Sequence, residues 1–170
     1  MPLAHRRTTW LGLALVACML EGAALYFQYG LDLDPCVLCV YQRAAVLGML
    51  LSALIVMMAP RMLMLRWIGY LGWGLAAGWC LQLALELSGM QIGWIEPSLS
   101  CDVNARFPDW LKLDQWLPTL FRPTGFCGDI QWSFLALSIP QWMAILMLLL
   151  LLLLILLVVN DLRERRSPDP

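Results

Sequence analysis

The sequence predicts an all-α membrane protein: a four-transmembrane-helix bundle with a long loop on one side of the membrane. Three observations lead to this prediction. The 170 residues are 61% hydrophobic with a mean hydropathy of +0.73, which is too apolar for a soluble domain. Four stretches of about 20 apolar residues are each long enough to cross a bilayer. Helices of this length that run nearly parallel form a bundle, so residues 1–170 should make a single membrane domain.

The four predicted spans cover residues 10–29, 39–59, 67–87 and 142–159. The first is too long for a removable signal peptide and lacks a small-residue cleavage site, so we expect it to be retained. The last is almost pure leucine and should act as an anchor. The charged tail that follows it, residues 160–170, is expected to be disordered.

The charged residues predict the orientation of the spans. Lys and Arg gather in the segments that flank spans on the cytoplasmic side. Seven of the eleven cations fall on one side of a four-span bundle: Arg6, Arg7, Arg61, Arg66, Arg163, Arg165 and Arg166. We therefore expect both termini in the cytoplasm and the loops 30–38 and 88–141 on the other side. The net charge of -1 gives no indication of a nucleic-acid partner.

A Cys-X-X-Cys pair lies where the second span begins. At about 100° per residue, Cys36, Cys39 and Arg43 stand at i, i+3 and i+7 and share one helical face. Pro35 suits the first helical position, because its missing N–H would have no partner there. The positive end of the helix dipole should lower the pKa of a cysteine at this end, and Arg43 adds a fixed positive charge. The pair is therefore expected to be redox-active.

Other uses of this pair stay open at this point. A zinc site is disfavoured because the chain has one histidine, His5, and no second Cys-X-X-Cys, and no metal site is predicted. Haem attachment is disfavoured because Val40, not His, follows Cys39. A static disulfide or idle thiols also fit the motif, which is weak by itself.

The six cysteines divide into two pairs and two isolated residues. Cys101 and Cys127 lie in the loop that the charges place outside the cytoplasm, where disulfides persist. A structural bridge explains this pair well. A bridge within one helical turn restrains almost nothing, so Cys36 and Cys39 are interpreted as the chemical pair. Exchange through a mixed disulfide would connect the two pairs. The cysteines within the predicted spans are expected only to fill space in the packing: Cys18 and Cys80.

Three further features carry predictions. Glu21 lies in the outer half of the first span, where a carboxyl group either has a function or pairs to hold two helices together. Gly74 and Gly78 have the spacing for close helix approach. Residues 109–117 predict a short amphipathic helix that either lies flat on the membrane or packs within the loop. Its apolar face would hold Trp110, Leu113 and Leu117.

Longer motifs make the sequence similar to a known family. They are Pro35-Cys36-Val37-Leu38-Cys39-Val40-Tyr41-Gln42-Arg43, Cys101-Asp102, Arg106-Phe107-Pro108-Asp109-Trp110-Leu111, Cys127 and Pro140-Gln141-Trp142. Over nearly its whole length the chain resembles the bacterial disulfide bond formation protein B (DsbB) family. The resemblance implies a protein-dithiol:quinone oxidoreductase of the bacterial inner membrane with a periplasmic long loop. The implied partners are a DsbA-like periplasmic thioredoxin-fold protein, the membrane quinone pool and the lipid bilayer, and the implied cofactor is ubiquinone or menaquinone.

The resemblance also implies roles for five residues. The DsbA-like thiolate would attack a Cys101–Cys127 disulfide and form a mixed disulfide with Cys101. Cys127 would then be reoxidised by exchange with Cys36. Cys39 would donate electrons to the quinone, and Arg43 would stabilise the negative charge that develops there.

Alternatives to this interpretation concern the pocket and the partner. Some relatives in the family carry a histidine linked to the quinone site near the outer end of span three, where this sequence has Leu87. Pocket residues beyond Arg43 are therefore not predicted, and Arg43 itself has the alternative of extending to the lipid head groups. The chain would alternatively oxidise a different periplasmic dithiol protein, or be a non-catalytic membrane protein with a stapled outer loop.

Overall fold

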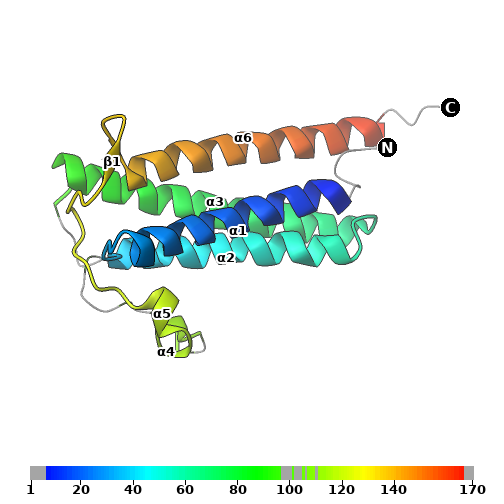
Figure 1. Ribbon diagram of the computed structural model, residues 1–170. Helices are drawn as coiled ribbons and strands as arrows, with labels where there is room; N and C mark the ends of the chain where they lie inside the picture. Colours follow the sequence, from blue (N-terminus) through cyan, green and yellow to red (C-terminus); the bar gives the residue numbers. More distant parts are fainter. Residues whose placement is uncertain (1–6, 97–100, 102–104, 106, 110, 167–170) are drawn as a thin grey trace.

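The computed structural model describes residues 7–96, 101, 105, 107–109 and 111–166. Its long helices are α1 (Arg7–Gly30), α2 (Val37–Met58), α3 (Leu63–Ile92) and α6 (Ile139–Arg166). These four helices are long and apolar enough to cross a membrane. The prediction of an all-α, four-span membrane protein is therefore confirmed (Figure 1).

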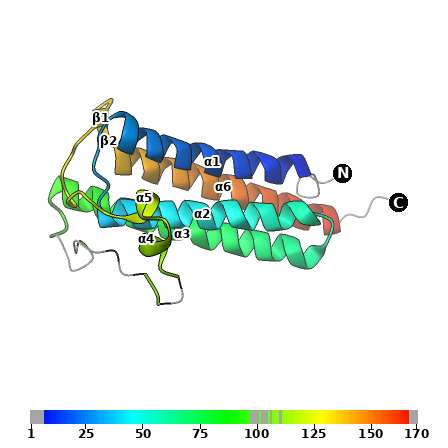
Figure 2. The same cartoon turned by 60° about the horizontal axis from the view of Figure 1, so that its bottom comes forward.

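The bundle has two chemically different ends. We call the end with both termini and the α2–α3 turn the terminal end (Figure 1). The opposite end, where α2 and α6 begin, is called the cysteine end because four of the six cysteines gather there. α2 packs against both α1 and α3, and α3 packs against α6 (Figure 2).

A core of large side chains runs between the helices. Its fully buried members include Trp10 of α1, Met49 of α2, Trp73 of α3 and Met147 of α6. Lipid tails are as apolar as these side chains, so close packing, rather than transfer out of water, holds the spans together.

Small residues on α3 allow the helices to approach closely. A Cβ on Gly69 would clash with the Val56 side chain of α2. Of the predicted glycine pair, Gly74 lies at an interface, since its Cβ would meet Leu154 of α6 at 3.1 Å. Gly78 has open space around it, so the prediction of close approach there is wrong.

α3 continues beyond its predicted end. It reaches Ile92 and stops at Gly93, the C-cap residue, whose φ of +80° suits glycine. The added turns carry α3 to the loop cysteines.

α6 also extends beyond the predicted span. It continues to Arg166, so the prediction of disorder from residue 160 is wrong for residues 160–166, and residues 167–170 lie outside the described part of the chain. The helix is held here because Asp161 pairs with Arg66 of α3.

The long loop contains two short helices and one hairpin. α4 (Leu113–Trp116) and α5 (Pro118–Phe121) replace the amphipathic helix predicted over residues 109–117. The predicted helix is thus present only over Leu113–Trp116. It ends there because Pro118 disfavours helical backbone at Leu117, whose φ and ψ are -134° and 65°. Trp110, assigned to its apolar face, lies outside the described residues. The hairpin pairs two antiparallel strands, β1 (Ser133–Phe134) and β2 (Leu137–Ser138).

Candidate active site

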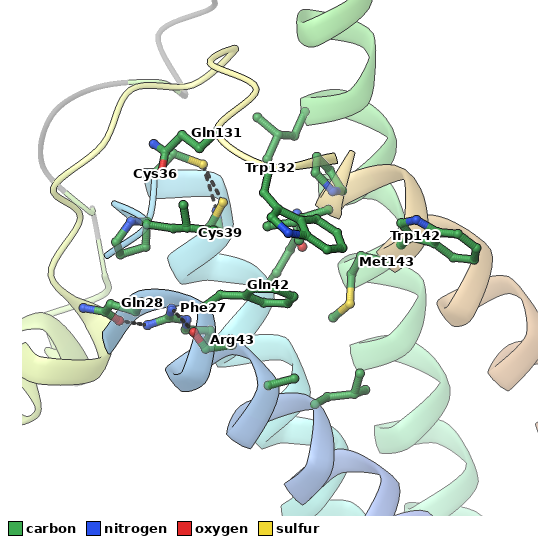
Figure 3. Close-up of a pocket in the computed structure, with 18 of the residues that line it drawn as sticks. Phe27, Gln28, Cys36, Cys39, Gln42, Arg43, Gln131, Trp132, Trp142 and Met143 are labelled. Carbon is green, nitrogen blue, oxygen red and sulfur yellow. Dashed lines mark hydrogen bonds between the residues drawn. The ribbon is translucent and has the colours of Figure 1, made fainter. Parts of the chain in front are cut away.

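Cys36 caps the first turn of α2. The helix begins at Val37, so the prediction that Pro35 occupies its first position is wrong. The Cys36 sulfur replaces the usual capping oxygen and accepts a hydrogen bond from the Cys39 N–H at 3.3 Å. The sulfur atoms of Cys36 and Cys39 lie 2.7 Å apart (Figure 3). The start of the helix therefore brings the two thiols within reach of a disulfide.

Backbone hydrogen bonds hold the long loop against the start of α2. The N–H groups of Thr124 and Gly125 both donate to the Pro35 carbonyl, at 3.0 and 3.1 Å. Gly125 passes so close to Asp34 that a Cβ on the glycine would clash with the Asp34 carbonyl. Only glycine allows this approach, which delivers Cys127 to the first turn of α2.

The sulfur atoms of the two cysteine pairs form one connected series. The series runs Cys101, Cys127, Cys36, Cys39, and a side-chain hydrogen bond joins each residue to the next. These four residues pack with apolar side chains of α2 and α3: Leu38, Leu83, Leu87 and Met90. The structure thus brings together two pairs that are far apart in the sequence.

The surroundings give the two loop cysteines opposite acidities. The hydrogen bond from the Cys36 thiol, assisted by one from Cys101, lowers the pKa of Cys127 to about 6. Burial, together with the hydrogen bond to Cys127, raises the pKa of Cys101 to about 12. At neutral pH Cys127 is therefore the thiolate of the loop pair and Cys101 the thiol.

Cys36 departs from the acidity expected at a helix start. Its hydrogen bonds to Cys127 and Cys39, together with its burial, raise the pKa of Cys36 well above its usual range. The prediction of a lowered pKa here is wrong, because these effects outweigh the helix dipole. The proton stays on Cys36 and the negative charge lies on Cys127.

A mostly apolar cavity of about 380 Å³ lies beside Cys36 and Cys39. Its walls come from α1, α2, α6 and loop residues 126–132, with a smaller contribution from α3. α1 and α6 have almost no direct contact with each other, and the cavity occupies the space between them. Its volume is in the range of small-ligand sites.

Two buried polar atoms in the cavity wall have no hydrogen-bond partner among the described residues. They are Oε1 of Glu21 on α1 and Nε2 of Gln42 on α2. Such an atom costs about 1–3 kcal/mol, so the pair indicates a cavity that receives a polar ligand. Figure 3 shows Gln42 extending from α2 toward Met143 of α6. The sequence analysis missed Gln42, although its position three residues after Cys39 was an available signal.

Arg43 lines the same cavity, but protein oxygens hold its guanidinium. Nη1 donates to Gln28 Oε1 at 2.5 Å and to the Leu120 carbonyl at 3.0 Å, and Nη2 donates to the Ala24 carbonyl at 3.1 Å. Arg43 therefore connects α2 to α1 and to α5. The residue is only 7% exposed, which does not fit an arginine extended to the lipid head groups.

A chain of four aromatic rings crosses the rim of the cavity. The centroid of Trp132 lies 5.2 Å from that of Phe27 on α1 and 6.1 Å from that of Phe134 on β1. Phe134 in turn lies 6.3 Å from Trp142 on α6. The hairpin thus connects α1 to α6 where these helices lack direct packing.

The comparison with known proteins agrees with this geometry. A family model described as disulfide bond formation protein DsbB matches residues 6–157. The chain belongs to the DsbB family. Membership indicates a disulfide-forming oxidoreductase, and it confirms the resemblance found from the sequence motifs.

Individual relatives support the assignment to the DsbB family. Disulfide bond formation protein B of Shewanella frigidimarina (strain NCIMB 400) is 48% identical over 141 residues, which cover 83% of each chain. That of Shewanella amazonensis (strain ATCC BAA-1098 / SB2B) is 49% identical over 142 residues, 84% of this chain and 83% of the relative. That of Shewanella sp. (strain ANA-3) is 46% identical over 142 residues, 84% of this chain and 81% of the relative.

The structure also shows the positions of three other residues that the sequence analysis discussed. Cys80 is fully buried in α3, as predicted for a packing residue. Cys18 is exposed on α1, so the prediction that it packs inside the bundle is wrong. Leu87 belongs to the cluster around Cys36 and lines the cavity, so it presents an apolar side chain to the site.

Proposed function

We propose that this DsbB-family protein oxidises the dithiol of a DsbA-like periplasmic thioredoxin-fold protein and transfers the two electrons to a membrane quinone, ubiquinone or menaquinone. The observation that supports the proposal is the connected series of four sulfur atoms. The series begins in the loop, which a soluble partner can reach, and ends beside a cavity between spans, which a lipid-soluble acceptor can reach.

In the first half-reaction, a thiolate of the partner attacks Cys101 of a Cys101–Cys127 disulfide. Cys127 leaves as a thiolate, which the Cys36–Cys39 disulfide can then receive as a nucleophile. The second thiol of the partner then displaces Cys101. The partner departs with its own disulfide, and the loop pair is left as a dithiol.

In the second half-reaction, the Cys127 thiolate attacks Cys36 of a Cys36–Cys39 disulfide and Cys39 leaves. Attack of Cys101 on Cys127 restores the loop disulfide and releases Cys36. Two electrons have now moved to the pair at the cavity wall. Reoxidation of Cys36 and Cys39 passes these electrons on and resets the chain.

The cavity fits the head group of a quinone. Nε2 of Gln42 is a buried donor without a partner among the described residues, and a quinone carbonyl is an acceptor. The apolar walls suit the ring and its isoprenoid chain. When bound, a quinone supplies a two-electron acceptor whose oxygens take up protons. The positive charge of Arg43 would favour the negative charge that develops there.

We also propose that the protein lies in the bacterial inner membrane with both termini in the cytoplasm. Arg7, Arg61, Arg66 and Arg163 belong to segments at the terminal end of the bundle. Positive residues favour the cytoplasmic side, so the cysteine end faces the periplasm. Labelling of Cys101 and Cys127 from outside intact cells tests this orientation.

Anaerobic mixing with a water-soluble quinone and a reduced DsbA-type protein tests the reaction. We expect one quinone to be reduced for each dithiol oxidised. The absorbance of the quinone measures its reduction. Substitution of any redox cysteine by serine should abolish turnover: Cys36, Cys39, Cys101 and Cys127. Cys18→Ser is the control and should keep full activity. Full turnover by Cys39→Ser would contradict the proposed electron route.

The partner is tested separately. In a Cys127→Ser variant the unpaired Cys101 thiol should attack the disulfide of the oxidised partner and form a mixed disulfide with it. This adduct should accumulate, because Cys127 is not there to attack Cys101 and displace the partner. Trapping in cells followed by mass spectrometry identifies the attached protein. A partner outside the DsbA-like class would replace that part of the proposal.

A further inference from the structure

We propose that Glu21 is the acid that delivers one of the two protons to a bound quinone. This inference rests on the proposed function and adds a catalytic residue to it. Glu21 lies on α1 and lines the cavity together with Cys36 and Cys39. Its Oε1 atom is buried and has no hydrogen-bond partner among the described residues.

A purely structural role does not account for this carboxyl group. The alternative considered from the sequence is that the Glu21 carboxyl group pairs with another residue and holds two helices together. Arg43 is the charged neighbour available for such a pair. The Arg43 Nη atoms instead donate to Gln28, Ala24 and Leu120. Arg43 and Glu21 attract each other electrostatically without a direct contact between their charged atoms. Within the described residues Glu21 forms no ion pair. The carboxyl group thus belongs to the cavity wall, and one of its oxygens has no hydrogen-bond partner among the described residues.

The groups that face Glu21 are distributed over several elements. α2 presents Arg43 and Cys39 to the same cavity, and its N-cap residue Cys36 also lines it. Cys80 of α3 interacts electrostatically with Glu21. The α6 residues that line the cavity include no titratable side chain. The carboxylates at the rim are both exposed to solvent: Asp34 and Asp129.

Glu21 is therefore the cavity carboxyl group that lies below the rim. Asp34 accepts a hydrogen bond from the Thr124 hydroxyl at 2.8 Å and belongs to the loop attachment rather than to the cavity interior. Water reaches the rim but is displaced from an apolar cavity by a ring-shaped ligand. Protons needed inside must then come from protein groups, and Glu21 and the thiols are the ones present.

The step balances without a further reactant. Conversion of the Cys36 and Cys39 thiols to a disulfide releases two electrons and two protons, and reduction of a quinone to a quinol takes up the same number. As Cys39 gives up electrons, the Glu21 carboxyl donates its proton to a carbonyl oxygen of the quinone. The carboxylate takes back one thiol proton and ends the cycle unchanged. The second thiol proton goes to the other oxygen.

The first test is steady-state quinone reduction by Glu21→Gln, which keeps the shape and polarity of the side chain but cannot transfer a proton. We expect kcat to fall about a hundredfold or more, with the apparent KM for quinone within about twofold of wild type. Glu21→Asp retains the acid and should recover part of the rate. The matched control is Glu164→Gln, an exposed position near the end of α6, which should leave the rate unchanged.

Two further measurements do not depend on turnover. Infrared difference spectra of the quinone-free protein between low and high pH should contain a buried carboxyl C=O band that is absent from Glu21→Gln. Quenching of Trp132 and Trp142 fluorescence by added quinone should give the same affinity in both proteins, because these rings lie at the cavity.

Each outcome separates this inference from the function on which it rests. A wild-type kcat in Glu21→Gln overturns the proton role while the proposed function stands. A loss confined to quinone affinity assigns Glu21 to binding and overturns the proton role as well. If the wild-type protein fails to reduce quinone, the proposed function and this step are both overturned.

Discussion

Nη1 of Arg66 lies 3.1 Å from Oδ1 of Asp161, and the two side chains are 4% and 2% exposed. This ion pair joins the start of α3 to the last turns of α6 at the terminal end, opposite the cysteines. Asp161→Ala should destabilise the protein by about 3 kcal/mol, because it leaves the Arg66 charge buried without its counter-ion. The measurement is the free energy of unfolding in detergent micelles titrated with a denaturing detergent.

The double variant Arg66→Met with Asp161→Leu provides the control for the ion pair. It removes both charges and should recover most of the lost stability, because no unpaired charge remains. A double variant as unstable as Asp161→Ala would show that the destabilisation comes from lost packing and not from the buried charge.

The reactivity of Cys127 should depend on pH with a midpoint near its pKa of about 6. The pKa is lowered, so the thiolate is present above this pH and is lost as the pH falls through it. Alkylation of the fully reduced protein, resolved by mass spectrometry, should therefore be fast at neutral pH for Cys127. It should be slow for Cys101, whose pKa is raised to about 12.

Cys36→Ala checks the cause of this acidity. It removes the thiol that donates to Cys127, so the midpoint of Cys127 alkylation should rise toward that of an ordinary cysteine. An unchanged midpoint would mean that Cys36 does not set the acidity of the loop pair.

Gly125→Ala should slow disulfide exchange between the two cysteine pairs. Its Cβ would clash with the Asp34 carbonyl and push the loop away from the start of α2, so Cys127 would lose its position beside Cys36. We expect exchange at least about tenfold slower, since a displacement on the order of 1 Å is enough for such a loss. Gly12→Ala is the matched control, because no atom lies within 4 Å of its added Cβ. Equal exchange rates in the two variants would contradict the role given to Gly125.

Arg43→Ala should raise the apparent KM for quinone. The change removes a cation from the cavity wall and three hydrogen bonds that hold α1 and α5 to α2. The cation lost from the cavity wall is expected to raise the apparent KM about tenfold, which corresponds to about 1.4 kcal/mol. Arg43→Lys keeps the charge but cannot make all three bonds, and should lie in between. An unchanged KM in Arg43→Ala would limit the residue to anchoring the helix.

Gln42→Leu should weaken quinone binding by about tenfold, or about 1.4 kcal/mol, because it removes the unpaired donor from the cavity wall. The stability of the quinone-free protein should stay the same or rise, since a buried polar atom without a partner is removed. Binding is followed by tryptophan quenching and stability by detergent unfolding. Tighter binding by Gln42→Leu would show that Nε2 does not face the ligand.

Local features of the chain were predictable because they depend on residues close in sequence. Four apolar stretches required four spans, and the three-residue spacing of Cys36 and Cys39 placed two thiols on one helical turn. The family assignment also followed from the sequence motifs. The roles of the four cysteines and Arg43 stay predictions. Predictions failed where a neighbouring residue changed the result of a local rule. Pro118 shortened the predicted loop helix, and the hydrogen bonds of Cys36 to Cys127 and Cys39 raised the pKa that the helix dipole should lower.

What the sequence alone determined is the membrane-spanning helical character of the protein and the redox-capable motif at a helix start, since hydrophobicity and helical periodicity are properties of single segments. The tertiary structure decided which cysteine of the loop lies beside which cysteine of the Cys-X-X-Cys pair. Cys127 reaches Cys36 only because Pro35 accepts the loop N–H groups and Gly125 has no side chain. It also decided that α1 and α6 leave a cavity between them and that two polar atoms in its wall stay unpaired. Such features depend on distances between residues from different helices, which the order of residues along one segment does not specify.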